Sequence, residues 1–123
     1  MSKRVLIIDD EEHIRQMMRL TLEAAGYEVG EAKDGPEGLG LYGKGAWDVV
    51  ALDQRMPGMD GATLLRHIRA CDGLETIPAV ALTAHAMKAD RDALLSAGFN
   101  AYLSKPITDD ELLFATIKKQ MAN

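Results

Sequence analysis

Polar and charged residues follow four separate apolar runs of this chain, each at the point where the run ends. The runs are residues 5–8, 49–52, 79–82 and 101–104. The residues that follow them are Asp9 and Asp10, then Asp53, Thr83 and Lys105. Short apolar runs between turn signals are typical of buried parallel strands, and ligands of open parallel sheets bind beyond the carboxyl ends of the strands. If the runs are neighbouring strands, carboxylates, a hydroxyl and an ammonium group meet at one edge, as in a catalytic site.

The aspartates of this set favour a metal site. Asp9 or Asp10 could instead cap the following helix, but such a cap explains one aspartate and leaves its neighbour and Asp53 unexplained. Carboxylates that lie close together raise each other's pKa unless a cation neutralises them. Two carboxylates with a backbone carbonyl and waters suit Mg²⁺, and the alternating Asp/Asn loop of a calcium-binding hand is absent from the sequence. We therefore expect Mg²⁺ as the cofactor.

A lysine and a threonine beside a magnesium site indicate that the missing partner is a phosphoryl group. Asp53 is the expected nucleophile, because it stands alone after its run while Asp9 and Asp10 remain to hold the metal. Lys105 would neutralise the phosphoryl oxygens, and the Thr83 hydroxyl would donate a hydrogen bond to one of them. Taken singly, Thr83 could satisfy its own strand end and Lys105 could be a solvated surface residue, so only the whole set is specific.

Helix-period segments alternate with the apolar runs and predict a parallel sheet with helices on both faces. A fifth strand fits residues 27–32, which gives five strand–helix units in one domain of 123 residues. Asp60 is the expected N-cap of the third helix. Thr108 and Glu111 form the expected capping box of the fifth helix.

Glycine residues predict the ends of two helices and weaken a third. Gly26 and Gly98 follow the first and fourth helical patterns and predict helix stops. The region of the second helix contains Gly35, Gly38, Gly40, Gly43 and Gly45. Each interior glycine costs about 0.8–1.0 kcal/mol relative to alanine, so we expect this helix to be the least stable and most mobile of the five.

Composition and charge argue against several classes of function. The net charge is −5 and the sequence has no stripe of lysine and arginine, which argues against direct DNA binding. The single cysteine, Cys71, cannot form an internal disulfide and suits a reducing compartment. No apolar stretch reaches the roughly 18 residues of a membrane span, so we expect no membrane insertion and a cytoplasmic location.

Two further patterns carry little weight. Residues 38–43 match the G-x-G-x-x-G dinucleotide fingerprint, but they lie well past the second strand, and the acidic residues after the first strand would repel a pyrophosphate. The histidines are scattered without zinc-ligand spacing. His13 and His67 are expected on solvated helix surface, whereas His85 stands apart because it lies two residues beyond Thr83.

At these site residues the chain closely resembles the receiver domain of bacterial two-component response regulators, over essentially its whole length. The matching stretches are residues 5–11, 53–61, 81–84 and 102–106. The resemblance implies a flavodoxin-like (βα)5 fold, an α/β doubly wound five-stranded parallel sheet of order 2-1-3-4-5. It also implies that Asp53 is the phosphoacceptor for a histidine kinase or histidine phosphotransfer domain.

The resemblance also assigns roles to individual residues. The implied magnesium ligands are the side chains of Asp10 and Asp53, the backbone carbonyl of Arg55 and, through water, Asp9. Lys105 would pair with the phosphoryl group, and a cis peptide bond to Pro106 would aim it into the site. Thr83 would move to hydrogen-bond the phosphoryl group, and the small Ala84 would leave access to that group open. Tyr102 would then turn inward as the switch aromatic residue.

Two positions of the resemblance are expected to tune the lifetime of the acyl phosphate. Arg55 and His85 lie two residues after Asp53 and Thr83, respectively. The Arg55 guanidinium would reach the phosphoryl group or His85 and slow the attack of water; alternatively, both side chains point to solvent. Residues 83–88 also resemble receivers of hybrid histidine kinases, which favours membership of a phosphorelay.

The expected product of phosphorylation is an altered surface on the fourth helix, fifth strand and fifth helix, which would bind an unknown downstream protein. We expect a single receiver domain over residues 1–123 with no output domain. The protein would not be an enzyme, although it would assist its own phosphorylation and dephosphorylation. Alternatives are a receiver that only docks partners without being phosphorylated, and a Mg²⁺-dependent phosphatase. The phosphatase would need a second aspartate where this chain has Arg55.

Overall fold

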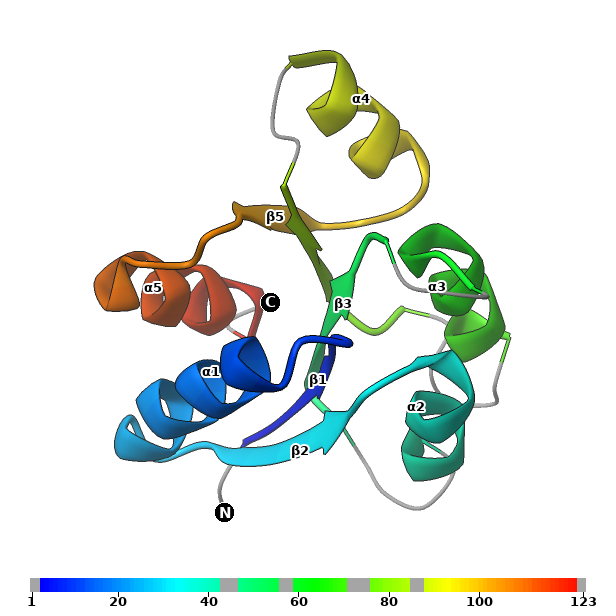
Figure 1. Cartoon of the computed structure of the whole chain (residues 1–123). Helices are drawn as coiled ribbons and strands as arrows, with labels where there is room; N and C mark the ends of the chain where they lie inside the picture. The colour runs from blue at the N-terminus through cyan, green and yellow to red at the C-terminus, as the bar shows by residue number, and fades with distance from the viewer. Residues whose placement is uncertain (1–2, 43–46, 56–58, 71–75, 85–87, 122–123) are drawn as a thin grey trace.

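The computed structural model describes residues 3–42, 47–55, 59–70, 76–84 and 88–121 of the chain. Its strands are β1 (Arg4–Ile8), β2 (Glu28–Ala32), β3 (Val49–Asp53), β4 (Ala79–Thr83) and β5 (Ala101–Ser104). Its helices are α1 (Glu12–Ala24), α2 (Gly35–Tyr42), α3 (Gly61–Arg69), α4 (Lys88–Ser96) and α5 (Asp110–Met121). Strands and helices alternate as the sequence pattern predicts (Figure 1). Among these described helices, none has the length and apolar character to cross a membrane.

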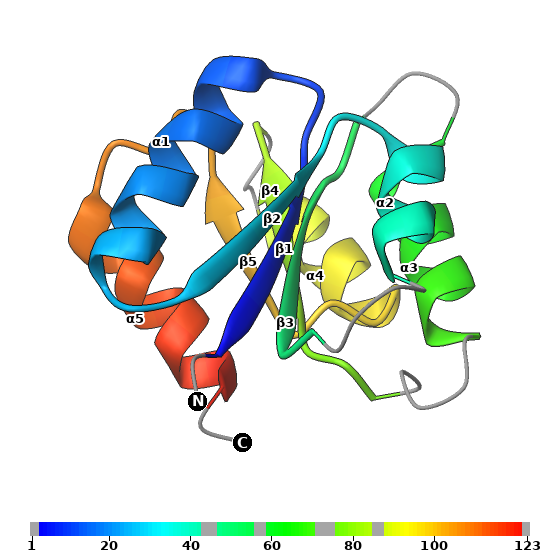
Figure 2. The same ribbon diagram turned by 90° about the horizontal axis from the view of Figure 1, so that it is seen from below.

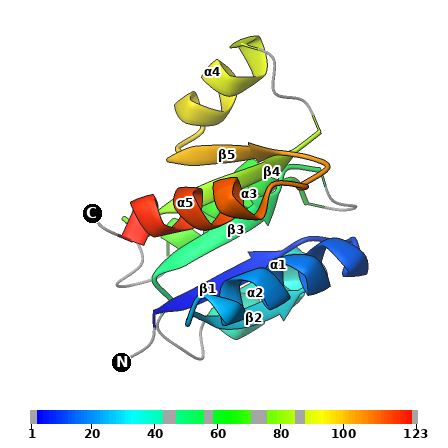
Figure 3. The same ribbon diagram turned by 90° about the vertical axis from the view of Figure 1, so that its left-hand side faces the viewer.

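The five strands form one parallel sheet in the order β2-β1-β3-β4-β5, which confirms the predicted flavodoxin-like fold. Helices α1 and α5 cover one face, and α2, α3 and α4 cover the other (Figures 2 and 3). Successive strand residues point to opposite faces, so Val49 packs on the α1/α5 side and Val50 on the other. Because helices cover both faces, β3 and β4 are buried along their whole length.

Two helix ends predicted from glycine, and one predicted cap, are confirmed. Gly26 and Gly98 have φ angles of 96° and 106°, in the left-handed region that glycine adopts without a Cβ penalty. The Asp60 carboxylate accepts a hydrogen bond from the Thr63 amide at 2.8 Å and caps α3. This cap fixes the start of the helix that directly follows the β3 end of the sheet.

The cap predicted for α5 is wrong by one residue. Asp109, rather than Thr108, accepts a hydrogen bond from the Leu112 amide at 3.0 Å, and the helix begins at Asp110. Glu111 therefore lies one position short of the place that a capping box requires. Aspartate and threonine are both good N-caps, so the sequence offers two adjacent candidates and packing of the helix decides between them.

Hydrogen exchange is expected to find the backbone amides of α2 less protected than those of α1. Helix α2 has 8 residues, of which Gly35, Gly38 and Gly40 are glycine, whereas the 13 residues of α1 include none. The glycines lower helix stability by about 0.8–1.0 kcal/mol each relative to alanine. Native-state exchange monitored by NMR measures both helices in one experiment, and equal protection of the two would refute the prediction.

Candidate functional site

The carboxyl ends of β1, β3, β4 and β5 bring the predicted site residues to one edge of the sheet. A cleft of about 320 Å³ opens there, and its lining residues are Asp10, Glu11, Asp53, Gln54, Arg55, Thr83, Ala84 and Lys105. The buried Asp9 is in contact with this cleft through Lys105. Residues far apart in the sequence therefore form one polar site, as their positions after the apolar runs predict.

Backbone contacts beyond the strand ends hold the floor of the cleft in place. The Gln54 amide donates to the Leu82 carbonyl at 2.9 Å, and the Lys105 amide donates to the Thr83 carbonyl at 2.7 Å. A Cβ atom on Gly61 would lie 2.8 Å from the carbonyl oxygen of Asp53, so the first residue of α3 must be glycine for the helix to approach so closely. These contacts fix the position of Asp53 at the end of β3.

The carboxylates of Asp9, Asp10 and Asp53 form an acidic cluster. One oxygen from each residue lies within 4.8 Å of the others. Asp9 and Asp53 are 0% and 4% exposed, whereas Asp10 is exposed to the cleft. The N-cap residue of α1 is Glu11, whose side chain accepts no capping hydrogen bond, so neither aspartate occupies the N-cap position that the sequence also allowed.

The Lys105 ammonium group lies among these carboxylates. Its Nζ is 2.9 Å from Asp9 Oδ2, 3.2 Å from Glu11 Oε1 and 3.4 Å from Asp53 Oδ1. The Lys105–Pro106 bond is cis, as predicted. Burial acts to lower the pKa of Lys105, but the close contact with the Asp9 carboxylate and the charge of Asp53 outweigh it and raise the pKa. The lysine is therefore charged at neutral pH.

The acidity of Asp53 is strongly altered by its surroundings. Burial and the neighbouring charge of Asp9 raise the pKa of Asp53 from 3.8 to about 6, against the opposing effects of the Arg55 amide and Lys105. The Arg55 amide donates to Asp53 Oδ1 at 3.2 Å. A carboxylate that is this costly to ionise is a good ligand for a divalent cation, because the cation removes the repulsion.

The arrangement fits a hard divalent cation. The cluster offers oxygen ligands only, which is the ligand type that Mg²⁺ prefers. Asp9 Oδ2 is buried and, among the described residues, accepts no hydrogen bond of normal geometry although it lies close to Lys105 Nζ. A buried carboxylate oxygen with unused capacity, next to two further carboxylates, can accept a hydrogen bond from a metal-bound water.

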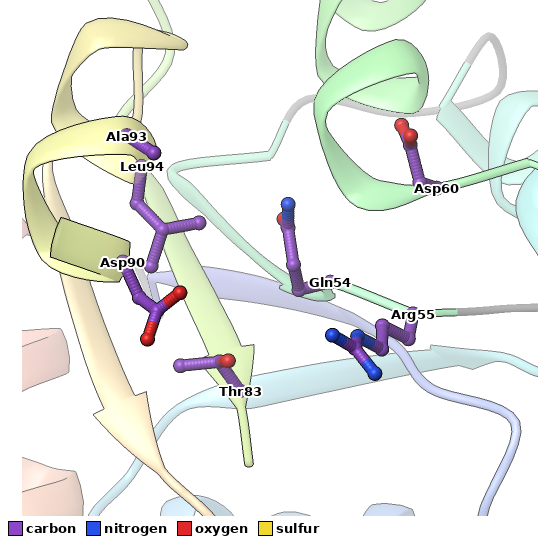
Figure 4. Close-up of a pocket in the computed structure, with 7 residues that line it drawn as sticks. All are labelled: Gln54, Arg55, Asp60, Thr83, Asp90, Ala93 and Leu94. Carbon is purple, nitrogen blue, oxygen red and sulfur yellow. The ribbon is translucent and has the colours of Figure 1, made fainter. Parts of the chain in front are cut away.

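The two predicted switch residues lie at the β4 and β5 end of the site. Thr83 is 5% exposed and lines both the main cleft and a second cleft of about 250 Å³ between α3 and α4 (Figure 4). Tyr102 is half-buried, and its hydroxyl accepts a hydrogen bond from Arg91 Nη1 at 3.1 Å. The Arg91 guanidinium also lies 5.9 Å from the centre of the Tyr102 ring. Arg91 of α4 is thus the partner of Tyr102 in this state.

The two predicted lifetime-tuning residues are only partly described. Arg55 is exposed and lines both clefts, and its side chain extends toward the side of the cleft where Thr83 lies (Figure 4). His85 lies outside the described residues. Ala84 is exposed at the mouth of the main cleft, where it leaves the approach to Asp53 open.

Three polar contacts of the site were not predicted from the sequence. Glu11 contacts Lys105 across the cleft, Arg15 Nη1 donates to the Asp9 carbonyl at 2.6 Å, and Arg91 contacts Tyr102. The helical pattern of the sequence does place Arg15 near the start of α1, but it does not indicate that the side chain reaches back to the Asp9 carbonyl. Glu11 and Lys105 lie 94 positions apart in the sequence, and the Arg91–Tyr102 contact depends on how α4 packs on β5, so neither contact has a local signal.

Comparisons with known proteins agree with the fold. The model of the response regulator receiver domain family matches residues 5–117. The response regulator PleD of Caulobacter vibrioides is 39% identical over 118 residues, which are 96% of this chain but only 26% of PleD. The polar-differentiation response regulator DivK of Brucella anthropi is 33% identical, over 100% of this chain and 99% of its own length.

A solved structure adds a metal to the comparison. The receiver domain of sensor histidine kinase PA1611 from Pseudomonas aeruginosa PAO1, with a magnesium ion coordinated in its active site cleft, has a TM-score of 0.88 and 28% identity, and the match covers both chains fully. The chain described here therefore belongs to the response regulator receiver domain family and is a module of two-component signalling.

Proposed function

We propose that the protein is a phosphoacceptor in which Asp53 receives a phosphoryl group, with the help of Mg²⁺, from a phosphohistidine of a histidine kinase or phosphotransfer domain. The observation that carries this proposal is the gathering of Asp9, Asp10 and Asp53 around Lys105 in an open cleft. A buried carboxylate with a raised pKa, such as Asp53, beside a fixed cation is typical of functional sites rather than of packing. Family membership supports the same chemistry.

Magnesium would be held by the side chains of Asp10 and Asp53, by the Arg55 carbonyl and, through water, by Asp9. When bound, Mg²⁺ supplies positive charge that neutralises the oxygens of the incoming phosphoryl group. The donor set is consistent with this role, because the oxygens of the three carboxylates lie within 4.8 Å of one another. The exposed Asp10 keeps one side of the cluster accessible from the cleft.

The residues of the chain would do the rest by positioning and charge. An oxygen of the ionised Asp53 forms a bond to phosphorus while the bond from phosphorus to the histidine nitrogen breaks, and the imidazole leaves. The charged Lys105, already 3.4 Å from Asp53 Oδ1, would attract the phosphoryl oxygens. The Thr83 hydroxyl would donate a hydrogen bond to one of these oxygens. The protein would in this way assist its own phosphorylation and dephosphorylation.

The output would follow from the contacts of Thr83 and Tyr102. A phosphoryl group adds roughly −1.5 to −2 charges and new acceptor oxygens, which favour movement of Thr83 toward the site. Tyr102 would then exchange its hydrogen bond to Arg91 for an inward position. The resulting change on α4, β5 and α5 would be recognised by a downstream protein, because a switch needs states that the partner binds differently.

The proposal is tested by incubating the protein with acetyl phosphate and Mg²⁺ and following intact mass. A phosphoryl adduct is expected on the parent and on the matched control Asp60→Asn, which changes an aspartate that caps α3 and does not line the main cleft. Asp53→Asn and the parent in EDTA should carry none. An adduct on Asp53→Asn would overturn the choice of acceptor. No adduct on the parent, together with no binding of beryllofluoride, would favour the docking-only alternative.

Replacing Arg55 by alanine is expected to shorten the lifetime of the acyl phosphate several-fold. The exposed guanidinium lines the cleft beside Asp53, where it would obstruct the water that attacks the phosphoryl group. The decay of the adduct by intact mass, after removal of acetyl phosphate, measures the lifetime in both proteins. Equal lifetimes would mean that Arg55 points to solvent in the phosphorylated state, the alternative noted from the sequence.

A further inference from the structure

The loop between β1 and α1, residues 9–11, is anchored through the amide, the carbonyl and one carboxylate oxygen of Asp9. Its amide donates to the Ala32 carbonyl at 3.1 Å, and its Oδ1 accepts from the Glu11 amide at 2.8 Å. Its carbonyl accepts from Arg15 Nη1 at 2.6 Å. Of these three contacts, the last is made by a side chain of α1, and it reaches back from the start of the helix to the loop that carries two of the three clustered carboxylates.

Arg15 is itself held in place by the neighbouring strand. Its Nε lies 3.4 Å from Glu31 Oε1 of β2, and the two side chains are 15% and 20% exposed. Glu31 also pairs with Arg19, one turn further along α1, and Arg19 donates to the Val29 carbonyl at 3.1 Å. A half-buried ion pair whose side chains also make other hydrogen bonds is more rigid than an exposed pair, because the surrounding contacts leave these side chains few other rotamers.

We propose that Arg15 is a positioning residue for the magnesium site, with Glu31 holding its guanidinium against the Asp9 carbonyl. The inference rests on the proposed function, since it concerns the loop that would supply Asp9 and Asp10 to the metal. A guanidinium fork can contact the loop carbonyl and the Glu31 carboxylate at once. Groups that orient ligands from outside the coordination sphere commonly change metal affinity by about 10- to 100-fold when removed.

A role in positioning and a role as a mere nearby charge predict opposite effects. A positive guanidinium close to the cluster repels a divalent cation, so its removal alone would tighten Mg²⁺ binding. Loss of the hydrogen bond to the Asp9 carbonyl would instead release the loop, so the carboxylates would have to be ordered when the metal binds, and binding would weaken. The sign of the change in Mg²⁺ affinity therefore separates the two roles.

The test is the dissociation constant of Mg²⁺, measured by isothermal titration calorimetry on the full chain. Arg15→Met is expected to bind Mg²⁺ about tenfold more weakly than the parent. Arg15→Lys keeps the charge but lacks the fork, and it should also bind several-fold more weakly. The matched control is Arg19→Met, the same substitution on the same helix. Arg19 contacts Glu23, Glu31 and the Val29 carbonyl rather than residues 9–11, so this variant should bind Mg²⁺ as the parent does.

Thermal unfolding without Mg²⁺ accompanies each titration, and the comparison uses variants that are folded at the titration temperature. If Arg15→Met does not fold, Arg15→Lys carries the test. Unchanged or tighter Mg²⁺ binding by the folded Arg15 variants would overturn the positioning role while leaving the proposed function intact. Failure of the parent to bind Mg²⁺ would overturn both, so the two failures are distinguishable.

Discussion

Asp53→Asn is expected to make the magnesium-free protein more stable at neutral pH than the parent, by about 2 kcal/mol. The pKa of Asp53 is raised from 3.8 to about 6 in the fold, chiefly by burial and by the charge of Asp9. The folded state therefore binds a proton more tightly than the unfolded state does. Ionising Asp53 above that pKa costs stability, and asparagine avoids the cost because it stays neutral.

The pH dependence gives this prediction its sign. Between 3.8 and about 6 the folded protein binds more protons than the unfolded chain, so the parent loses stability as the pH rises through this window. The advantage of Asp53→Asn should be full above the window, shrink as the pH falls through it and vanish below it. Urea unfolding in EDTA, at several pH values, measures both proteins.

A matched control shows whether the effect belongs to the site. Asp60 has a lowered pKa, because it accepts hydrogen bonds from Thr63, so its charged form stabilises the fold. Asp60→Asn should therefore bring no gain in stability at neutral pH. The raised pKa of Asp53 would be contradicted if Asp53→Asn were no more stable than the parent in EDTA, or if its gain in stability did not depend on pH.

Lys105→Met is expected to have two effects of opposite direction. Binding of Mg²⁺ should become several-fold tighter, because the ammonium group that now lies 2.9 Å from Asp9 and 3.4 Å from Asp53 no longer competes for the carboxylates. Phosphoryl transfer from acetyl phosphate should slow by about 100-fold, because a fixed cation that meets the developing charge is lost. Calorimetry measures the first effect and the rate of adduct formation by intact mass measures the second.

Lys118→Met is the matched control for this pair of measurements. Lys118 lies on α5 with its ammonium 5.6 Å from the centre of the Phe114 ring and is exposed, so the substitution removes a charge away from the cleft. Both measurements should match the parent. Weaker Mg²⁺ binding by Lys105→Met would mean that the lysine organises the cluster rather than competing for it. An unchanged transfer rate would remove Lys105 from the phosphoryl site.

Much of the fold was predictable because its signals are local. The apolar runs that end at Asp53 and Thr83 form buried strands in the structure. Gly26 and Gly98 follow helices and have positive φ angles, as predicted. The sheet order and the cis bond before Pro106 came from the family resemblance instead, since nothing local specifies either. The start of α5 was missed by one residue, because two adjacent side chains can serve as its cap.

The site was predictable in its members but not in its contacts. Positions at strand ends were enough to gather the carboxylates, the threonine and the lysine. The pairing of Arg91 with Tyr102 depends on how α4 lies over β5, which the sequence does not specify. The hydrogen bond from Arg15 to the Asp9 carbonyl joins a long side chain to the backbone. Because every residue has a carbonyl, the sequence does not show which one the arginine contacts.

Chemical mapping of the modified residue tests whether Asp53 carries the phosphoryl group. The protein is treated with acetyl phosphate and Mg²⁺, reduced with borohydride, digested and sequenced by mass spectrometry. Borohydride converts an aspartyl phosphate to homoserine, so we expect homoserine at position 53 and at no other aspartate position. Homoserine at Asp9 or Asp10, or intact aspartate throughout a protein that carried the adduct, would contradict it.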